Sequence, residues 1–200
     1  NFLVEFPLTS SLIKLGMGFS IERSLPTVQF TSLEKWFERY TSKNPQDAFI
    51  NGFVHLLADE FTNHNEVPLG QKTIKLLNAL GYGVIIPTGI VTGRSFISKG
   101  MLVEAKALAN ANVEQLVDLI SNEHPLIGIE PSAILTFRDE IPSLVDADKR
   151  EQAEQLKPNC LLIDEFIARE FKAGKISADS FHGKQLKILL HGHCHQKSIA

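Results

Sequence analysis

The chain has 200 residues, of which 44% are hydrophobic and 22% are charged, and its formal net charge is -3. These values are ordinary for a folded domain with a substantial core, and the small negative charge gives no electrostatic case for binding nucleic acid. No apolar run reaches the length of a bilayer span, and we expect no signal peptide. Two cysteines cannot form a disulfide framework, so a reducing, cytoplasmic setting is expected.

Residues 1–48 are predicted to form a small helical lead-in. Residues 7–16 are expected to be a short helix, and residues 20–30 are expected to be an extended connector. A boundary is predicted at residues 43–47, where Pro45 interrupts a polar stretch. Because the chain lacks an initial Met and stops at Ala200, we expect it to be a piece of a longer polypeptide.

A second helix is predicted within the lead-in, starting near residue 32. Thr31 and Glu34 have the spacing of a capping box, which predicts Thr31 as the N-cap. The residues that follow place an apolar stripe at helical spacing, made of Leu33, Trp36, Phe37 and Tyr40. We expect this stripe to face a core.

Residues 49–200 change to short apolar runs that alternate with amphipathic segments. Strands are predicted at residues 53–58, 84–86, 126–129 and 186–190, and helices at residues 69–80, 98–121, 149–156 and 160–171. Strands separated by helices predict an α/β fold with a parallel, Rossmann-like sheet and helices on both of its faces. Right-handed crossovers would bring the carboxyl ends of all strands to one edge.

Four polar loops would meet at that edge, where ligands gather in open α/β sheets. The first three loops contain Asp59, Glu60, Thr62, Asn63, His64 and Asn65; Thr88, Gly89, Thr92, Gly93, Arg94 and Ser95; and Glu130, Ser132, Thr136, Arg138 and Asp139. The fourth loop contains His191, His193, Cys194 and His195. Loops are polar in most proteins, so it is their convergence that predicts a ligand site.

The fourth loop carries imidazole and thiol groups, which are good ligands for zinc or iron. In an extended segment His191, His193 and His195 point to one side and Cys194 points to the other. One ion could therefore collect all four only at a sharp turn, and capping of nearby backbone groups by one or two histidines is the alternative. A mononuclear metal hydrolase is disfavoured because no carboxylate motif accompanies the histidines.

Two other features carry weaker signals. Gly93-Arg94-Ser95 resembles a phosphate-binding turn before a helix, yet no dinucleotide or P-loop pattern is present. Asp59 and Glu60 are expected to point apart, because neighbouring residues at a strand end face opposite ways. Cys160 is expected to be a packing residue.

Five segments, in order along nearly the whole chain, form a set of motifs: residues 18–26 (GFSIERSLP), 59–63 (DEFTN), 93–100 (GRSFISKG), 130–140 (EPSAILTFRDE) and 190–197 (LHGHCHQK). Together they resemble the iron–sulfur part of FAD-linked oxidases of the glycolate oxidase and D-lactate dehydrogenase type. This part is related to the B subunit of heterodisulfide reductase, and its repeats are called CCG domains.

The resemblance implies a fragment of a flavin- and iron–sulfur-dependent oxidoreductase that acts on a 2-hydroxy acid such as glycolate or D-lactate. Residues 49–200 would be one CCG-like repeat with a second repeat truncated at the C-terminus. Cys194 would be the metal ligand of an iron–sulfur cluster that also needs ligands beyond residue 200. His193, His195 and Arg94 would belong to the same cofactor-binding site.

The partners implied are flavin and ferredoxin-like modules of the same polypeptide, with FAD held in a different domain, and a redox acceptor. The whole protein would be cytoplasmic, with peripheral association at the inner face of the membrane as an open alternative. The isolated fragment is expected to be colourless and inactive.

The chain departs from the family pattern at the expected thiolates. Val91 and Thr92 stand where the family has paired cysteines, and Ala133 stands where it has another. Clusters are held by cysteine thiolates, which these residues cannot replace. The alternative interpretation is therefore a degenerate repeat that acts as a structural or docking module without metal.

Overall fold

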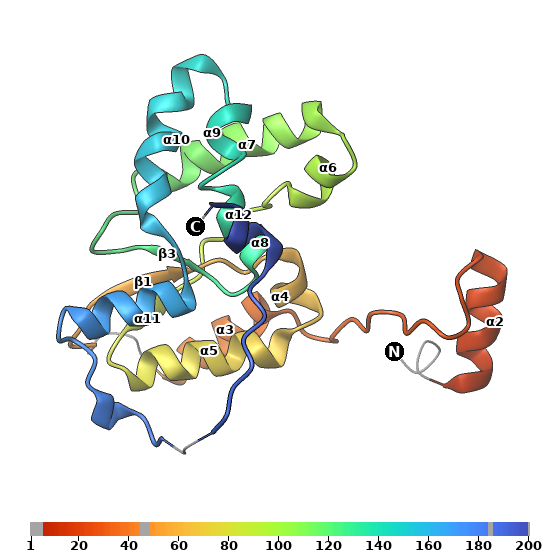
Figure 1. The fold of residues 1–200 in the computed structure, drawn as a ribbon, viewed down its shortest axis with the longest axis horizontal. Coiled ribbons are helices and arrows are strands. Elements are labelled where there is room, and N and C mark those ends of the chain that lie inside the picture. The colour runs from red at the N-terminus through yellow and green to blue at the C-terminus, as the bar shows by residue number, and fades with distance from the viewer. Residues whose placement is uncertain (1–5, 45–48, 184–185, 200) are drawn as a thin grey trace.

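The computed structural model describes residues 6–44, 49–183 and 186–199, and its centre is a four-stranded parallel sheet (Figure 1). The strands are β1 (Phe53–Leu56), β2 (Gly83–Ile85), β3 (Leu126–Gly128) and β4 (Cys160–Leu162), in the order β2-β1-β3-β4. All three pairings are parallel, with His55 opposite both Ile85 and Leu126. The predicted α/β class with a Rossmann-like parallel sheet is confirmed.

Helices precede the first strand, fill the connections between the strands and follow the last strand. They are α2 (Pro7–Met17), α3 (Leu33–Thr41), α4 (Glu60–His64), α5 (Val67–Ala79), α6 (Arg94–Ser98), α7 (Leu102–Leu116), α8 (Pro131–Thr136), α9 (Ile141–Leu144), α10 (Arg150–Leu156), α11 (Ile163–Lys172) and α12 (Cys194–Ile199). Single 3-10 turns occur at Ala147–Lys149, Lys157–Asn159 and Ala178–Ser180. Among the described residues, no helix is both long and apolar enough to span a membrane.

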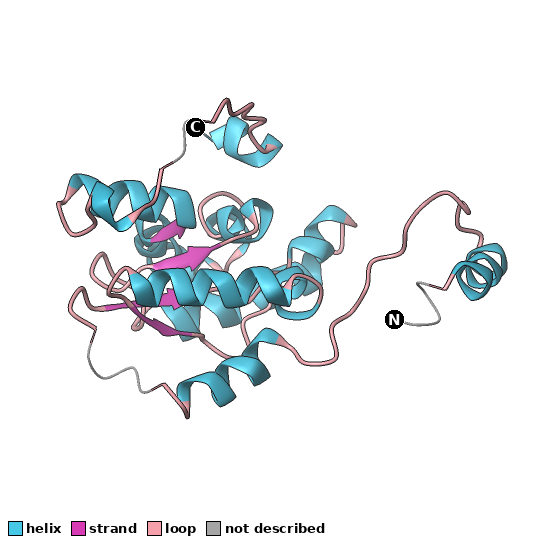
Figure 2. Ribbon diagram, turned by 90° about the horizontal axis from the view of Figure 1, so that it is seen from below, coloured by secondary structure: helices cyan, strands magenta, loops and turns pink. Residues whose placement is uncertain are grey.

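The core lies on both faces of the sheet because successive strand residues point to opposite sides. Leu126 joins a cluster with residues of α7, α8, α9 and α10, whereas its neighbour Ile127 joins one with residues of α3, α5 and α11. Figure 2 shows the sheet between helices on its two sides. This double burial explains why the strands appear in the sequence as continuous apolar runs.

The chain reverses its direction of winding between β1 and β3. The connection after β1 leads to β2 on one side, and the connection after β2 leads past β1 to β3 on the other side. The two connections therefore diverge at the carboxyl ends of β1 and β3, which is the topological switch point where α/β sheets bind ligands. Asp59 and Glu130 follow these two strands within three residues.

The lead-in forms the two predicted helices, with one correction. The N-cap of α3 is Ser32 and not Thr31, since the Ser32 hydroxyl accepts the backbone N–H of Lys35. Leu33 is fully buried, and the rest of the predicted stripe packs against the same core. The predicted boundary at residues 43–47 falls largely on residues 45–48, outside the described part of the chain.

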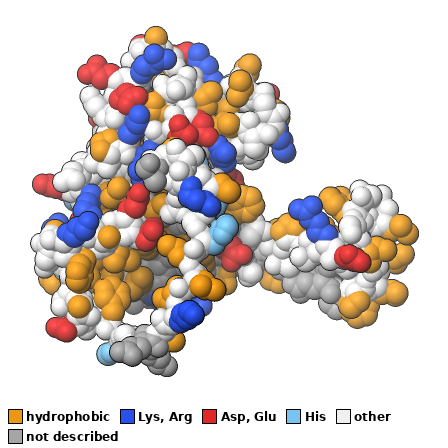
Figure 3. Space-filling model, in the orientation of Figure 1, with side chains coloured by type: hydrophobic (Ala, Val, Ile, Leu, Met, Phe, Trp, Pro, Cys, Tyr) orange, Lys and Arg blue, Asp and Glu red, His pale blue; other side chains and the backbone are white. Residues whose placement is uncertain are grey.

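Helix α2 stands apart from the α/β body, joined to it by the extended connector that was predicted at residues 20–30 (Figure 1). Its exposed apolar side chains, which gather over the separate lobe in Figure 3, are Leu8, Leu12, Leu15 and Met17.

The prediction of a buried strand at residues 186–190 is wrong. This segment has neither helical nor strand structure, and Leu189 and Leu190 are both 92% exposed. The fourth strand is instead β4, at the start of the helix predicted for residues 160–171. Pro158 and the 3-10 turn around it end α10, and Cys160 then pairs beside Leu126 before α11 begins at Ile163. Residues 160–162 therefore form a strand beside β3, although their sequence pattern is helical.

The helix predicted for residues 98–121 is broken near its start. Gly100 has a φ of 73°, a left-handed conformation that stops an α-helix. Helix α6 therefore ends at Ser98, and α7 starts at Leu102 and ends at Leu116. The break turns α6 toward α8, with which it forms one side of the site described next.

Candidate functional site

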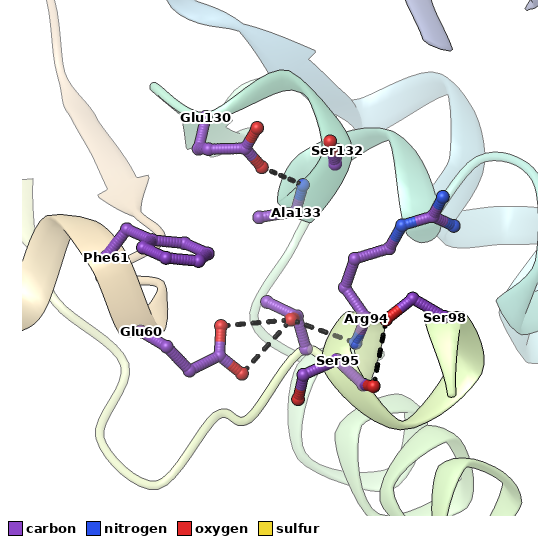
Figure 4. A pocket seen from close by; sticks show the side chains of 9 residues that line it. Glu60, Phe61, Arg94, Ser95, Ser98, Glu130, Ser132 and Ala133 are labelled. Carbon is purple, nitrogen blue, oxygen red and sulfur yellow. Dashed lines mark hydrogen bonds between the residues drawn. The ribbon is translucent and has the colours of Figure 1, made fainter. Parts of the chain in front are cut away.

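A cavity of about 240 Å³ lies at the switch point, where three of the four predicted loops meet. Its walls come from α4, from Thr92 together with α6, and from α8 with its N-cap Glu130 (Figure 4). The lining residues are Glu60, Phe61, Thr92, Arg94, Ser95, Ser98, Glu130, Ser132 and Ala133. The predicted convergence of the first three loops is thus present, with hydroxyl and carboxylate groups on its surface.

Thr92 connects two walls of the cavity. Its hydroxyl lies 3.1 and 3.2 Å from the two carboxylate oxygens of Glu60 and accepts the backbone N–H of Arg94. Thr92 is 2% exposed, so this bond to Glu60 is shielded from water. A donor and a carboxylate acceptor in a sheltered place form a strong pair. Thr92 therefore stabilises the cavity wall by donating a hydrogen bond to the Glu60 carboxylate.

The third wall is fixed by a helix cap. The Glu130 carboxylate accepts the backbone N–H of Ala133 at 2.6 Å and so begins α8. Ala133 is 3% exposed and leaves only a methyl group at the cavity. Ser132 lies between the cavity and the fourth loop, with its hydroxyl 3.5 Å from Nε2 of His193.

Asp59 is part of the framework under the cavity. It is 1% exposed, and its side chain caps α4 by accepting the backbone N–H groups of Phe61 and Thr62. Burial raises the pKa of Asp59, the charge of Glu130 raises it further, and the hydrogen bonds from Thr62 and Phe61 oppose these effects. Asp59 and Glu60 point to different partners, as the sequence predicted.

We expect Asp59→Asn to change how stability depends on pH. A folded-state pKa above 3.8 means that the folded protein takes up this proton before the unfolded chain does. The contribution of Asp59 to stability therefore increases as the pH falls from the raised pKa toward 3.8, by about 1.4 kcal/mol for each pH unit between these two values. In urea unfolding, the free energy of unfolding of wild type should therefore increase relative to that of Asp59→Asn as the pH falls through this range. Equal pH slopes would contradict this account, and the exposed Asp179→Asn is the control.

The fourth loop approaches the cavity through α12, which packs against α8. His193 Nδ1 accepts the backbone N–H of His195, and Gln196 Oε1 accepts that of His193. The alternative that a histidine caps neighbouring backbone is thus confirmed for His193. Cys194 is exposed at the first position of α12, and His191 is exposed before it.

His195 lies in a separate polar cluster that the sequence patterns did not predict. Its Nε2 is 3.2 Å from Asp139 Oδ2 and 3.8 Å from Glu140 Oε2. Arg94 forms an ion pair with Glu140 Oε1, and therefore connects this cluster to the cavity that it lines. Asp139 belongs to the third predicted loop, whereas Glu140 and the contacts of both carboxylates with His195 were missed, because the carboxylates stand more than fifty residues before His195, in the turn between α8 and α9.

The predicted cofactor residues consequently fall into two places. His193 and Arg94 border the cavity, whereas His195 contacts Asp139 and Glu140. Arg138, which belongs to the third predicted loop, forms an ion pair with Glu165 at 2.7 Å.

The described residues do not supply the ligands of an iron–sulfur cluster by themselves. Thr92 and Ala133, which replace expected cysteines, do line the cavity, and Val91 directs its backbone carbonyl to Asn112. Cys160 is fully buried in the core, and burial raises the pKa of its thiol to about 12. A cluster needs thiolates, and Cys194 is the single exposed thiol of the described chain.

Comparisons with known proteins relate the chain to dehydrogenases. It is 24% identical to the C subunit of the anaerobic glycerol-3-phosphate dehydrogenase of Escherichia coli over 190 residues, 94% of this chain and 46% of that protein. It is 22% identical to the D-2-hydroxyglutarate dehydrogenase of Escherichia coli over 97% of this chain and 19% of that protein. A D-2-hydroxyglutarate dehydrogenase of Pseudomonas putida is 31% identical over 48% of this chain and 10% of that protein.

The chain spans about half the length of its glycerol-3-phosphate dehydrogenase relative and about a fifth of the Escherichia coli D-2-hydroxyglutarate dehydrogenase. No family model and no solved structure matches it. The sequence-based expectation of an oxidoreductase-related chain is supported by these relatives.

Proposed function

We propose that this chain is a module of a larger flavin- and iron–sulfur-dependent oxidoreductase that oxidises a 2-hydroxy acid or a similarly hydroxylated anion. The module would serve the electron-transfer region, while FAD and ferredoxin-like centres would lie in other modules. The proposal is supported by the similarity of nearly the whole chain to parts of two kinds of dehydrogenase. Glycolate and D-lactate remain substrate candidates beside D-2-hydroxyglutarate and glycerol 3-phosphate.

The observation that carries the proposed role is the position of Cys194. This exposed thiol begins α12, which packs on α8 and so lies beside the switch-point cavity. The neighbouring His193 reaches the cavity wall at Ser132. Cys194 would supply one thiolate to a cluster whose remaining ligands belong to other parts of the complete protein. The cavity walls would shape the approach to that centre.

A second candidate is a scaffold or docking module that binds no metal. The specific observation in its favour concerns the positions where the family has cysteines. The residues there either already form hydrogen bonds or have no side-chain atom that can bind a metal. The Thr92 hydroxyl is bonded to Glu60, and Ala133 offers only a methyl group. Under this candidate Cys194 would be an ordinary surface thiol, and any peripheral membrane contact or redox partner would be bound elsewhere.

Iron and acid-labile sulfide in the complete, anaerobically purified protein distinguish these candidates. We expect Cys194→Ser to remove about one cluster's content of iron and sulfide, because a hydroxyl does not replace a thiolate. The matched control is Cys160→Ala, which removes the buried thiol and should leave both contents unchanged. Unchanged iron in Cys194→Ser would support the scaffold. The chain in isolation is expected to be colourless and inactive.

A further inference from the structure

The polar cluster of His195, Asp139 and Glu140 has the composition of a small metal site. One ligand atom from each residue lies within 4.8 Å of the other two. The imidazole comes from α12, and the two carboxylates come from the turn that joins α8 to α9. Segments that are distant in sequence therefore present three potential ligands to one point.

Unsatisfied atoms in this cluster point to a missing partner. Two buried atoms, Oε2 of Glu140 and Nδ1 of His195, have no hydrogen-bond partner among the described residues. The His195 side chain is only 8% exposed, and its Nε2 faces both carboxylates. A buried carboxylate oxygen without a donor is costly to the folded state. A cation between His195 and Glu140 would remove that cost.

The local charge also favours a cation. Asp139 and Glu140 contribute two carboxylates, and the cation that the structure places on them is Arg94, which binds the other oxygen of Glu140. Arg138, the next residue to Asp139, is engaged by Glu165 instead. Arg94 thus orients Glu140 and leaves Oε2 directed toward His195. Hydrogen bonds to a metal ligand from residues that do not themselves bind the metal hold that ligand in position.

We propose that His195 Nε2, Asp139 Oδ2 and Glu140 Oε2 bind a divalent transition-metal ion. One imidazole and two carboxylates suit zinc, manganese or ferrous iron, and three protein ligands leave a coordination position open. Asp139 is 49% exposed, which gives the ion access from solvent. The ion would cross-link α12 to the turn between α8 and α9, and would hold Cys194 and His193 beside the cavity. Cys194 is not a ligand of this divalent ion.

Isothermal titration of zinc chloride into the chelator-treated complete protein tests the site. We expect binding that weakens at least about tenfold in His195→Gln and in Asp139→Asn. The control His191→Gln changes an exposed histidine of the same loop, and it should bind zinc as wild type does. Zinc at about 100 times its dissociation constant should also raise the Tm of the wild-type protein by a few degrees.

The outcomes separate this proposal from the function proposed above. Cys194→Ser should keep zinc binding even where it loses cluster iron. Absence of zinc binding in wild type would overturn the site, and so would binding that is lost in Cys194→Ser but kept in Asp139→Asn. Asp139 lies near the surface, so this variant is expected to fold. Circular dichroism of each variant verifies that the change in zinc binding is not a change in folding.

Discussion

Gly128→Ala is expected to destabilise the protein by about 3 kcal/mol, since it overpacks the centre of the fold. A Cβ atom at Gly128 would stand 2.3 Å from Cβ and 2.8 Å from Cγ2 of Ile134. Ile134 is fully buried in α8, and its Cβ is attached directly to the helix backbone. Rotation of a flexible side chain therefore cannot relieve the contact, and α8 must move away from β3.

Thermal unfolding measures this effect. The expected loss corresponds to a fall in Tm of roughly 6–12 °C for a chain of this size. The control is Gly16→Ala, where no atom lies within 4 Å of the new Cβ. Because α8 carries Ser132 and Ala133, the substitution should also distort the cavity wall. A Gly128→Ala protein as stable as wild type would show that α8 is not packed against β3 as described.

Glu170→Leu is expected to cost about 3 kcal/mol, since Glu170 is the acceptor of a buried polar network. Glu170 is 3% exposed, and it accepts a 2.6 Å hydrogen bond from the Tyr82 hydroxyl and ion-pair contacts from Arg169 and Lys175. Leucine would leave the buried Tyr82 hydroxyl without this partner. The network joins the end of α11 to the start of β2, so its loss loosens one face of the sheet.

The control for this network is Tyr82→Phe, which removes only the hydroxyl and should cost about 1 kcal/mol. Burial alone would raise the pKa of Glu170, but hydrogen bonds from Tyr82, Lys175 and Arg169 outweigh it and lower the pKa below 4.5. The stability that ionised Glu170 contributes is therefore complete above pH 4.5 and is lost as the pH falls through the lowered value. Denaturant unfolding should show this acid-dependent loss in wild type and not in Glu170→Leu.

The α/β class, the first three strands and the longer helices of the α/β body could be predicted because each buries an apolar run or stripe of its own. The short helices α4, α8 and α12 could not, because their residues are polar enough to be expected as loops. β4 could not be located, because Cys160–Leu162 continues without a break into the helical pattern of α11. Residues 186–190 have strand composition but no neighbouring strand among the described residues, and they are exposed. Composition predicts which residues prefer to be buried, whereas pairing depends on the rest of the fold.

The sequence predicted the edge of the sheet at which the candidate site lies, but not which residues contact one another there. Parallel topology alone brings Glu60, Thr92 and Glu130 together, so their convergence follows from the sequence. The Glu140 partners, Arg94 and His195, depend on how α6 and α12 pack, which no local pattern encodes. The missing thiolates were visible in the sequence, and the structure adds that Thr92 and Ala133 line the cavity without them.

If this chain serves electron transfer, a hydroxy-acid substrate should deliver electrons to a centre that depends on Cys194. The complete protein is mixed anaerobically with D-2-hydroxyglutarate, and separately with glycolate, D-lactate and glycerol 3-phosphate, and electron paramagnetic resonance records reduced iron–sulfur signals. We predict that at least one substrate produces a signal in wild type and that Cys194→Ser lacks part of it while Cys160→Ala retains it. Identical signals in all three proteins, or no reduction by any substrate, would contradict the assignment of this chain to electron transfer.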